Sequence, residues 1–417
     1  MRKIITSLEC VLVMLSCAFC FAYPAKFGLS PDNAKAFVLK ALDTAKKKIL
    51  LNVYEFEDED ITNLLIKKLK DEVTVVMLVE GKPVSQMSAD SKKMLSKIRK
   101  AMTVYKKIAS HVFIMESTNS NKKRRYTFDH AKYVVIDSKS VLISSENFTP
   151  HAFPISGGIG NRGWETLVDN KKLADELNAI FLEDSDPSFG DIVELKDPSL
   201  IPSPFIPFEW GKTLDSPLIG KRPVPTFAEE SGEVTDAALI TSPNALDDLV
   251  SLIDSAREHL ELEFMSLPST WLKSSGTRIQ SPIVSALIAA AKRGVAVKVL
   301  LNNEWVFSPK QPPNAPPKPN MVTAQLLQAY AKCYNFPIAA KIVDEKALGI
   351  TYIHNKGMLI DNEKAFINSI NGTQNSVVAN REVGVVLESP DAANYYEKAF
   401  QIDWEKSASI KLSSGCP

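Results

Sequence analysis

Apolar positions follow the same order of periodic segments in two parts of the chain. Each part begins with residues at helical spacing, continues with a run typical of a buried strand, and then repeats this helix and strand once more. The segments are 32–48, 49–56, 61–70 and the run from Val73 in the first part, and 245–258, 259–267, 282–293 and the run from Val295 in the second. The pattern predicts an internal repeat of two α/β units.

The later part of each unit predicts two paired strands and a closing helix. The paired runs are YVVID and VLISSEN in the first unit and GMLID and AFINSIN in the second, with polar residues between them that suit a tight turn. The closing helices are predicted over 171–183 and 390–404. Alternating strands and helices predict an α/β fold of two similar α-β-α layered domains, each with a mixed sheet.

Proline-rich sequence separates the two units. Prolines recur through 184–235 and block regular elements there, yet the same stretch contains Phe205, Phe208 and Trp210, which favour burial. We interpret 184–235 as a packed linker between a first domain at 23–183 and a second at 236–417. A further proline cluster, 308–320, predicts a long loop near the functional site.

The first 22 residues differ from the rest of the chain. Arg2 and Lys3 precede an apolar run from Cys10 to Ala22, and small residues stand before a cleavage point at Tyr23. This run is shorter than the roughly 20 apolar residues of a membrane-spanning helix. Residues 1–22 predict a signal peptide and an exported protein, whether secreted, periplasmic or on the outer cell surface. The alternative is an uncleaved N-terminal anchor.

Charge and cysteine content narrow the classes of function. Without residues 1–22 the chain carries 47 Lys and Arg against 48 Asp and Glu, so no global basic charge indicates nucleic acid binding. Of the 5 cysteines only Cys333 and Cys416 then remain, too few and too far apart for a metal centre. They form one disulfide or none, and the sequence predicts no metal and no cofactor.

The motif that carries chemistry occurs once in each unit, as HAKYVVID and HNKGMLID. A strand places His130 and Lys132 on one face, and likewise His354 and Lys356, so that each pair can reach one substrate oxygen. One such spacing alone is more often a surface accident. Two copies at equivalent places, in a chain with only 5 histidines, indicate a functional site.

Matching polar residues follow both motifs. Ser145 and Asn147 stand 15 and 17 residues after His130, and the equivalent residues after His354 are Ser369 and Asn371. Acidic residues come next. Glu382, in NREVGVV, is 28 residues after His354, and Glu165, in NRGWETLV, is 35 after His130, a difference that an insertion at 151–160 would explain. A carboxylate bonded to imidazole Nδ1 fixes the tautomer and raises the basicity of the ring.

This doubled pattern resembles the phospholipase D superfamily, whose HxKxxxxD signature occurs twice, each copy followed by a GSxN-like segment and an acidic residue. The resemblance covers most of the chain after residue 22. It implies two domains related by a pseudo-twofold axis, with both motifs meeting in one active site at their interface. Ser144 and Asn368 stand where the family pattern has glycine, so SSEN and NSIN are imperfect versions of that segment.

The resemblance also implies roles for the matching positions. His130 would be the nucleophile and His354 the general acid and then the base for water. Both lysines would bind the phosphate, and Asn147 and Asn371 would complete the oxyanion cage. Asp137 and Asp361 match aspartates that are usually structural.

The reaction class implied is metal-independent cleavage or transfer of a phosphodiester through a phosphohistidine. Phospholipase D-type attack on a phospholipid headgroup is the first interpretation, with Trp271, Trp305 and Phe307 available to acyl chains and contact with a membrane surface. An exported endonuclease is the alternative that the run KKRR at 122–125 favours. A non-catalytic surface-binding module is the third. A monomer would suffice for all three.

Overall fold

The computed structural model describes residues 22–84, 86–116, 124–155, 158–196, 222–308, 315–410 and 416. The predicted signal peptide therefore lies almost entirely outside the described residues, and so does much of the predicted linker. Within the part that is described, no helix is long and apolar enough to span a membrane.

The first half of the chain builds a nine-stranded mixed sheet with the order β8-β4-β3-β2-β5-β6-β7-β1-β9. Its strands are β1 (Tyr23–Ser30), β2 (Lys48–Val53), β3 (Thr74–Glu80), β4 (His111–Met115), β5 (Lys132–Ile136), β6 (Ser140–Ser144), β7 (Gly163–Asp169), β8 (Ile192–Glu194) and β9 (Glu230–Val234). Its helices are α1 (Ala34–Asp43), α2 (Glu59–Lys70), α3 (Ala89–Val104), α4 (Lys171–Asp184) and the 3-10 turn η1 (Pro187–Phe189).

The second half repeats this plan in an eight-stranded sheet with the order β10-β18-β17-β16-β11-β14-β15-β19. Its strands are β10 (Asp236–Ser242), β11 (His259–Phe264), β14 (Ala296–Leu301), β15 (Ile338–Ile342), β16 (Lys356–Ile360), β17 (Lys364–Asn368), β18 (Glu382–Glu388) and β19 (Ala408–Ser409), with a separate hairpin of β12 (Thr270–Leu272) and β13 (Arg278–Gln280). Its helices are α5 (Leu246–Asp254), α6 (Pro282–Lys292), η3 (Glu304–Phe307), α7 (Pro319–Tyr334), α8 (Glu345–Leu348), α9 (Gln374–Val378) and α10 (Pro390–Lys406).

The predicted repeat and the mixed α/β architecture are confirmed. Both sheets have the same pairing at their centres. In the first, β2 pairs in parallel with β3 and antiparallel with the motif strand β5. In the second, β11 pairs in parallel with β14 and antiparallel with the motif strand β16. The predicted tight turns after the motif strands are also present. Asp137 and Ser138, like Asp361 and Asn362, have positive φ within the three-residue connections 137–139 and 361–363.

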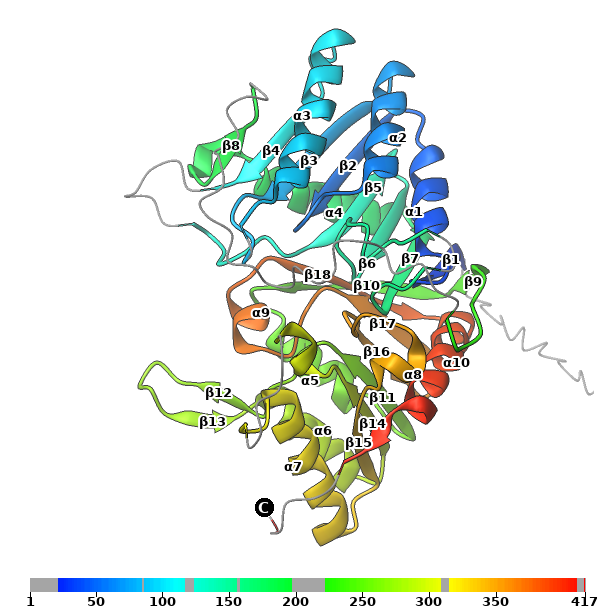
Figure 1. The fold of residues 1–417 in the computed structure, drawn as a ribbon, viewed down its shortest axis with the longest axis vertical. Coiled ribbons are helices and arrows are strands. Elements are labelled where there is room, and N and C mark those ends of the chain that lie inside the picture. Colours follow the sequence, from blue (N-terminus) through cyan, green and yellow to red (C-terminus); the bar gives the residue numbers. More distant parts are fainter. Residues whose placement is uncertain are drawn as a thin grey trace, which may run out of the picture.

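Three apolar clusters divide the molecule into layers. One lies between the first sheet and α1 to α3, and another between the second sheet and α5 to α7. The third joins the two sheets and includes residues of α4 and α10. The helices α1 to α3 and α5 to α7 therefore lie at opposite ends of the molecule, and the two sheets face each other across the middle (Figure 1).

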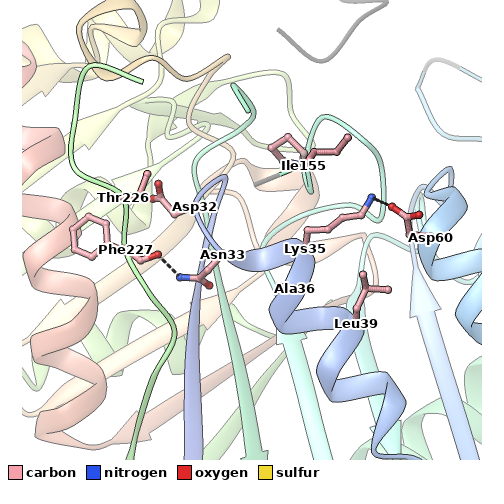
Figure 2. A pocket seen from close by; sticks show the side chains of 10 residues that line it. Asp32, Asn33, Lys35, Ala36, Leu39, Asp60, Ile155, Thr226 and Phe227 are labelled. Atoms are coloured by element: carbon pink, nitrogen blue, oxygen red, sulfur yellow. Dashed lines mark hydrogen bonds and ion pairs between the residues drawn. The ribbon is translucent and has the colours of Figure 1, made fainter. Parts of the chain in front are cut away.

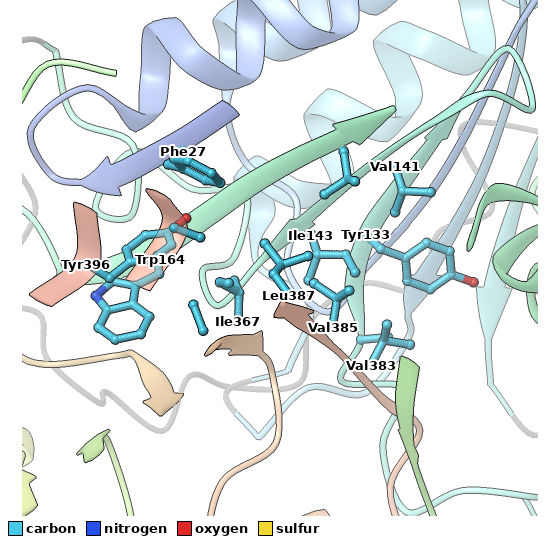
Figure 3. Close-up of a cluster of buried hydrophobic side chains, with 14 of the residues drawn as sticks. Phe27, Tyr133, Val141, Ile143, Trp164, Ile367, Val383, Val385, Leu387 and Tyr396 are labelled. Atoms are coloured by element: carbon cyan, nitrogen blue, oxygen red, sulfur yellow. The ribbon is translucent and has the colours of Figure 1, made fainter. Parts of the chain in front are cut away.

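The middle cluster packs apolar side chains of the two halves against each other. Figure 3 shows Trp164 and Tyr396 side by side, with Ile143 of the first half near Val385 of the second. The Trp164 and Tyr396 rings stack at a centroid distance of 4.6 Å. A fully buried aromatic side chain stabilises a fold by a few kcal/mol, so this shared core stabilises the interface in the same way as the interior of a domain.

A disulfide joins Cys333, on α7, to Cys416 near the end of the chain. It resolves the alternative that the sequence left open.

Candidate active site

Each motif histidine lies at the interface because the other half of the chain holds its backbone. The N–H of His130 donates to the carbonyl of Arg381 at 2.8 Å, and the N–H of His354 donates to the carbonyl of Arg162 at 2.9 Å. Asp129 bridges to Arg381, and Arg162 to Ile353, in two short parallel bridges. The two motif strands therefore begin at one place, and their side chains share one buried site.

The same two arginines form reciprocal ion pairs between the halves. Arg162 Nε donates to Asp403, at the end of α10, at 2.6 Å, and Arg381 Nε lies 2.7 Å from Asp184, at the end of α4. Both aspartates are buried. Buried charges are stable only when paired, so these contacts fix the register of one half against the other. The sequence analysis did not single out these residues.

His130 has a strongly held carboxylate partner. Its Nδ1 lies 2.8 Å from Oε2 of Glu382, which comes from the other half of the chain. Burial would raise the pKa of Glu382, but the neighbouring His130, Lys132 and Asn380 outweigh it, and the pKa falls below its ordinary value. An ionised carboxylate only accepts, so Nδ1 of His130 carries the proton and Nε2 is free to act. Burial lowers the pKa of His130 to about 4, against the attraction of Glu382.

His354 is paired differently. Its Nδ1 lies 3.1 Å from Oε2 of Glu146, although the direction does not satisfy a hydrogen bond. Burial, together with Lys356 and Lys132, holds the pKa of His354 well below its ordinary value. Glu146 is a partner that the sequence analysis missed, because the second motif has Ile370 at the matching place.

The prediction of Glu165 as an acidic partner needs correction. Its carboxylate is buried and accepts at 3.3 Å from the hydroxyls of Ser30 and Ser144, not from a histidine. Burial and the neighbouring Glu146 hold its pKa well above the ordinary value. The cause is register: Glu165 lies two residues further along its strand than Glu382 does, and an even shift keeps the face but places the side chain beside Ser30 and Ser144 instead of a histidine.

Both lysines are buried beside their histidines. Lys132 Nζ donates to the carbonyl of His130 at 2.7 Å, and Lys356 Nζ donates in the same way to the carbonyl of His354. Burial lowers the pKa of Lys132 to about 8, and burial and the charge of Lys132 lower that of Lys356 well below 10.5. An arriving phosphodiester would stabilise both ammonium groups, so the pair forms an anion site.

The two asparagines differ in their present partners. Asn147 donates from Nδ2 to Glu55 at 2.6 Å, whereas the backbone N–H of Asn371 donates to the hydroxyl of Ser376 at 3.0 Å. The side-chain carbonyl oxygens of Asn147 and Asn371 are buried and accept no hydrogen bond from the described residues. Unsatisfied buried polar atoms are uncommon and often mark a functional site.

The supporting residues hold the backbone. The hydroxyls of Ser145 and Ser369 accept from the N–H groups of Trp164 and Val383, at 2.9 and 3.1 Å. Asp137 and Asp361 each accept from three successive backbone N–H groups, at 46–48 and 257–259 respectively. The serines thus tie the segment after each motif hairpin to the strand that follows it, and the aspartates fix the turns at the far ends of the motif strands.

Aromatic rings line the approach to both motifs. Tyr54 lies 4.6 Å from the ring of His130, and Tyr352 lies 5.8 Å from that of His354. Phe307, on η3 before the second proline cluster, contacts Tyr352 at 5.0 Å. Trp271, by contrast, is buried and donates to the carbonyl of Gly372, so the prediction that it could touch acyl chains is wrong.

The basic run 122–125 is less available than its sequence suggests. Lys122 and Lys123 lie outside the described residues. Arg124 donates to the buried Glu80, and Arg125 pairs with Asp191 at 3.0 Å. The two arginines are therefore engaged within the fold and offer little charge to a polyanion.

No arrangement of three or more His, Cys, Asp or Glu that could hold a metal ion exists among the described residues. A cavity of about 550 Å³ lies elsewhere, at the start of α1, where Asn33 donates to the carbonyl of Phe227 and Lys35 pairs with Asp60 (Figure 2). Neither motif histidine lines it.

Comparisons with known proteins bear on the family and the fold. The family model described as "Cardiolipin synthase, PLD-like domain" matches residues 38–185 and 249–404. No curated protein sequence matches the chain. A solved phosphatidylserine synthase from Haemophilus influenzae Rd KW20 is 13% identical and superposes with a TM-score of 0.63, over 93% of this chain and 88% of that one.

Two other solved structures are more distant. Polyphosphate kinase from Porphyromonas gingivalis is 12% identical with a TM-score of 0.52, and the match spans 93% of this chain but 48% of that one. The phospholipase D family member Nuc from Salmonella typhimurium is 20% identical over 42% of this chain and 98% of that one, at a TM-score of 0.32. At these identities the likeness to the synthase and the kinase shows a common fold.

Proposed function

Because the chain belongs to the phospholipase D-like family, we propose that it is an exported phosphodiesterase that cleaves or transfers a phospholipid headgroup through a phosphohistidine. The observation that carries the proposal is the meeting of His130, Lys132, His354 and Lys356 at one buried interface, each histidine held by the opposite half.

The arrangement supports His130 as the nucleophile. Glu382 accepts hydrogen bonds from His130, Ser376 and Asn380, so it stays ionised and directs the lone pair of His130 Nε2 outward. Attack by Nε2 forms an N–P bond while the bond from phosphorus to the leaving oxygen breaks. Lys132 and Lys356 balance charge on the nonbridging oxygens as it redistributes.

His354 completes the cycle in the proposed mechanism. Burial keeps it neutral when the site is empty, but the negative phosphodiester stabilises its imidazolium. It gives a proton to the leaving alkoxide, and then takes one from the water or alcohol that attacks the phosphohistidine. That second attack breaks the N–P bond and leaves His130 neutral and His354 as the imidazolium, which returns to solvent, as the product leaves, the proton that it took up when the substrate bound.

Several observations favour a lipid over a nucleic acid. The chain after residue 22 has no basic excess, and Arg124 and Arg125 are engaged by acidic partners. The family description names cardiolipin synthase, and a similar fold is that of a phosphatidylserine synthase. Transfer to an alcohol is therefore part of the proposal beside hydrolysis. The complete lysine and histidine sets argue against a non-catalytic binding module.

A paired assay tests the proposal. The purified protein is offered phosphatidylcholine or phosphatidylglycerol vesicles with ethanol, and separately single-stranded DNA, both with EDTA, beside a variant with both His130→Asn and His354→Asn. We expect phosphatidic acid or phosphatidylethanol from the native protein alone. Oligonucleotide products would support the endonuclease alternative, and silence with all substrates would support a binding module.

Export is a separate part of the proposal. The Cys333–Cys416 disulfide supports it, since structural disulfides persist mainly in oxidising compartments. N-terminal sequencing of the protein from cell fractions tests it. We expect an exported form that begins near Tyr23; a full-length form in the membrane fraction would indicate the uncleaved anchor.

A further inference from the structure

The two halves differ at the position that supplies the carboxylate. Ser144 and Asn368 each stand 14 residues after their motif histidine, and they pair across the sheet with Glu165 and Gly384. Counting back two residues on each strand makes Gly163 the structural counterpart of Glu382. The edge strands agree, because Ser30 pairs with Gly163 as Ser242 pairs with Glu382.

Local sequence supports the same alignment. Gly163 follows Asn161 and Arg162, and Glu382 follows Asn380 and Arg381. Both arginines play the same reciprocal part at the interface, as described above. The first half therefore has a glycine where the second half has the partner of a catalytic histidine.

Glu146 fills the space that this glycine leaves. A Cβ added to Gly163 would lie 2.4 Å from both Cγ and Oε1 of Glu146, far closer than atoms in contact can approach. The carboxylate of Glu146 is then clamped by the equivalent asparagine: Asn161 Nδ2 donates to Glu146 at 3.1 Å, and Asn380 Nδ2 donates to Glu382 at 3.0 Å. The carboxylate is kept in place while its position in the sequence has changed.

We infer that Glu146 is the positioning residue of His354, a role that Gly163 permits by leaving the space free. The inference rests on the proposed function for its kinetic consequence. Glu146 acts through the imidazole, orienting it toward the leaving oxygen, and touches no reacting atom.

Glu146 responds to its surroundings differently from Glu382. Burial raises the pKa of Glu146 to about 7, although the ammonium groups of Lys356 and Lys132 and the amide of Asn161 oppose that rise. The charged or titratable groups that face it are Lys132, His354, Lys356, Glu165 and Tyr352. Its charge therefore changes within the range of an ordinary assay.

The first experiment uses leaving groups to separate positioning from folding. Glu146→Gln is compared with the native protein on an alkyl phosphodiester and on bis(p-nitrophenyl) phosphate, whose leaving group needs no proton. A positioning residue of the general acid predicts a fall of about 10²-fold in the rate of the first step on the alkyl ester. The fall in the rate of the p-nitrophenolate burst from the aryl ester should be much smaller; rapid quench measures both, because the second step still needs His354 as base on either substrate. Equal losses on both substrates would overturn the inference.

The second experiment moves the carboxylate back. Gly163→Glu alone should abolish activity, since the two side chains collide, whereas Glu146→Ile combined with Gly163→Glu rebuilds the arrangement of the second half. We expect the double variant to recover at least tenfold over Glu146→Ile. Glu165→Gln is the matched control and should keep native kcat, because the Glu165 carboxylate accepts from Ser30 and Ser144 and from neither histidine. Failure of the double variant to recover, although it melts like Glu146→Ile, would contradict the relocation.

A readout without turnover keeps this inference distinct from the proposed function. If the native protein cleaves neither diester, the proposed function fails, and NMR of the imidazole nitrogens still tests Glu146. Glu146→Gln should shift the Nδ1 signal of His354 and leave that of His130 unchanged. An unchanged His354 signal would overturn the inference.

Discussion

The two motif histidines share a sequence pattern and a fold position, but not an equal partner. Glu382 receives three side-chain hydrogen bonds and stays ionised, whereas Glu146 receives one from Asn161, and its Oε1 has no partner among the described residues. The difference shows that an internal repeat can preserve a group in space while its place in the sequence changes. It also gives a physical reason for the unequal roles proposed for the two histidines, since the carboxylate that stays ionised makes its partner imidazole the better nucleophile.

Replacing each histidine in turn should give the largest difference in activity between the two halves. His130→Asn should lower activity on the order of 10⁴-fold on every diester, because no leaving group substitutes for the nucleophile. His354→Asn should lose as much on alkyl esters but far less in the first step on bis(p-nitrophenyl) phosphate. Rapid-quench kinetics measures both.

Trapping of the intermediate provides the control for this assignment. His354→Asn should accumulate labelled phosphoprotein, because the base for water is also missing, and His130→Asn should show none. A label recovered on His354 would reverse the two roles.

The interface ion pairs should show the next largest effect, on stability. Arg162→Met removes the partner of the buried Asp403 and one partner of Asp32, so we expect a loss of about 3–5 kcal/mol in the free energy of unfolding. Arg381→Met should cost less, because Arg381 is slightly exposed and pairs with one aspartate. Chemical denaturation measures the free energy of unfolding of both variants, and equal losses would show that the two ion pairs contribute equally to stability.

The pH dependence of kcat/KM sharpens the comparison further. Burial lowers the pKa of His130 to about 4, so the neutral nucleophile persists until the pH falls below about 4. Burial lowers the pKa of Lys132 to about 8, so above that pH the loss of the ammonium should add a further fall of about tenfold per unit to the fall that follows deprotonation of His354. Glu382→Gln should move the acid limb lower still, because Glu382 raises the pKa of His130. An acid limb that does not move in Glu382→Gln would show that the limb does not report the titration of His130.

The turn aspartates should give the smallest effect. Burial opposes ionisation of Asp137 and Asp361, but three backbone N–H groups outweigh it and lower both pKa values below 3.8. Each should therefore stabilise the fold above about pH 4 and lose this contribution as pH falls through the lowered pKa. We expect Asp137→Asn and Asp361→Asn each to cost about 1–2 kcal/mol near neutral pH with unchanged kcat. A fall in kcat at full stability would assign them a part in the chemistry.

The sequence predicted secondary structure correctly where the periodicity of a segment alone decides whether it is a helix or a strand. The strand-helix-strand order and the two motif strands followed from alternation and β-branched runs, although the predicted helix 32–48 ends earlier, since α1 stops at Asp43 and β2 begins at Lys48. The domain boundaries at 183 and 236 stay predictions. The pairing of Glu165 was wrong because spacing was counted from the histidines, while the shared Asn-Arg pair before Gly163 and Glu382 was not used as the anchor.

The sequence alone determined the repeat, the two HxK motifs and the asparagines and serines that follow them, because these lie within single strands and their turns. Only the tertiary structure decided which carboxylate serves which histidine. Glu382 crosses to His130 and Glu146 crosses to His354 through contacts between residues far apart in the chain. Such pairing depends on how the two halves dock, and the buried arginines and the shared aromatic core fix that docking through contacts that no local pattern encodes.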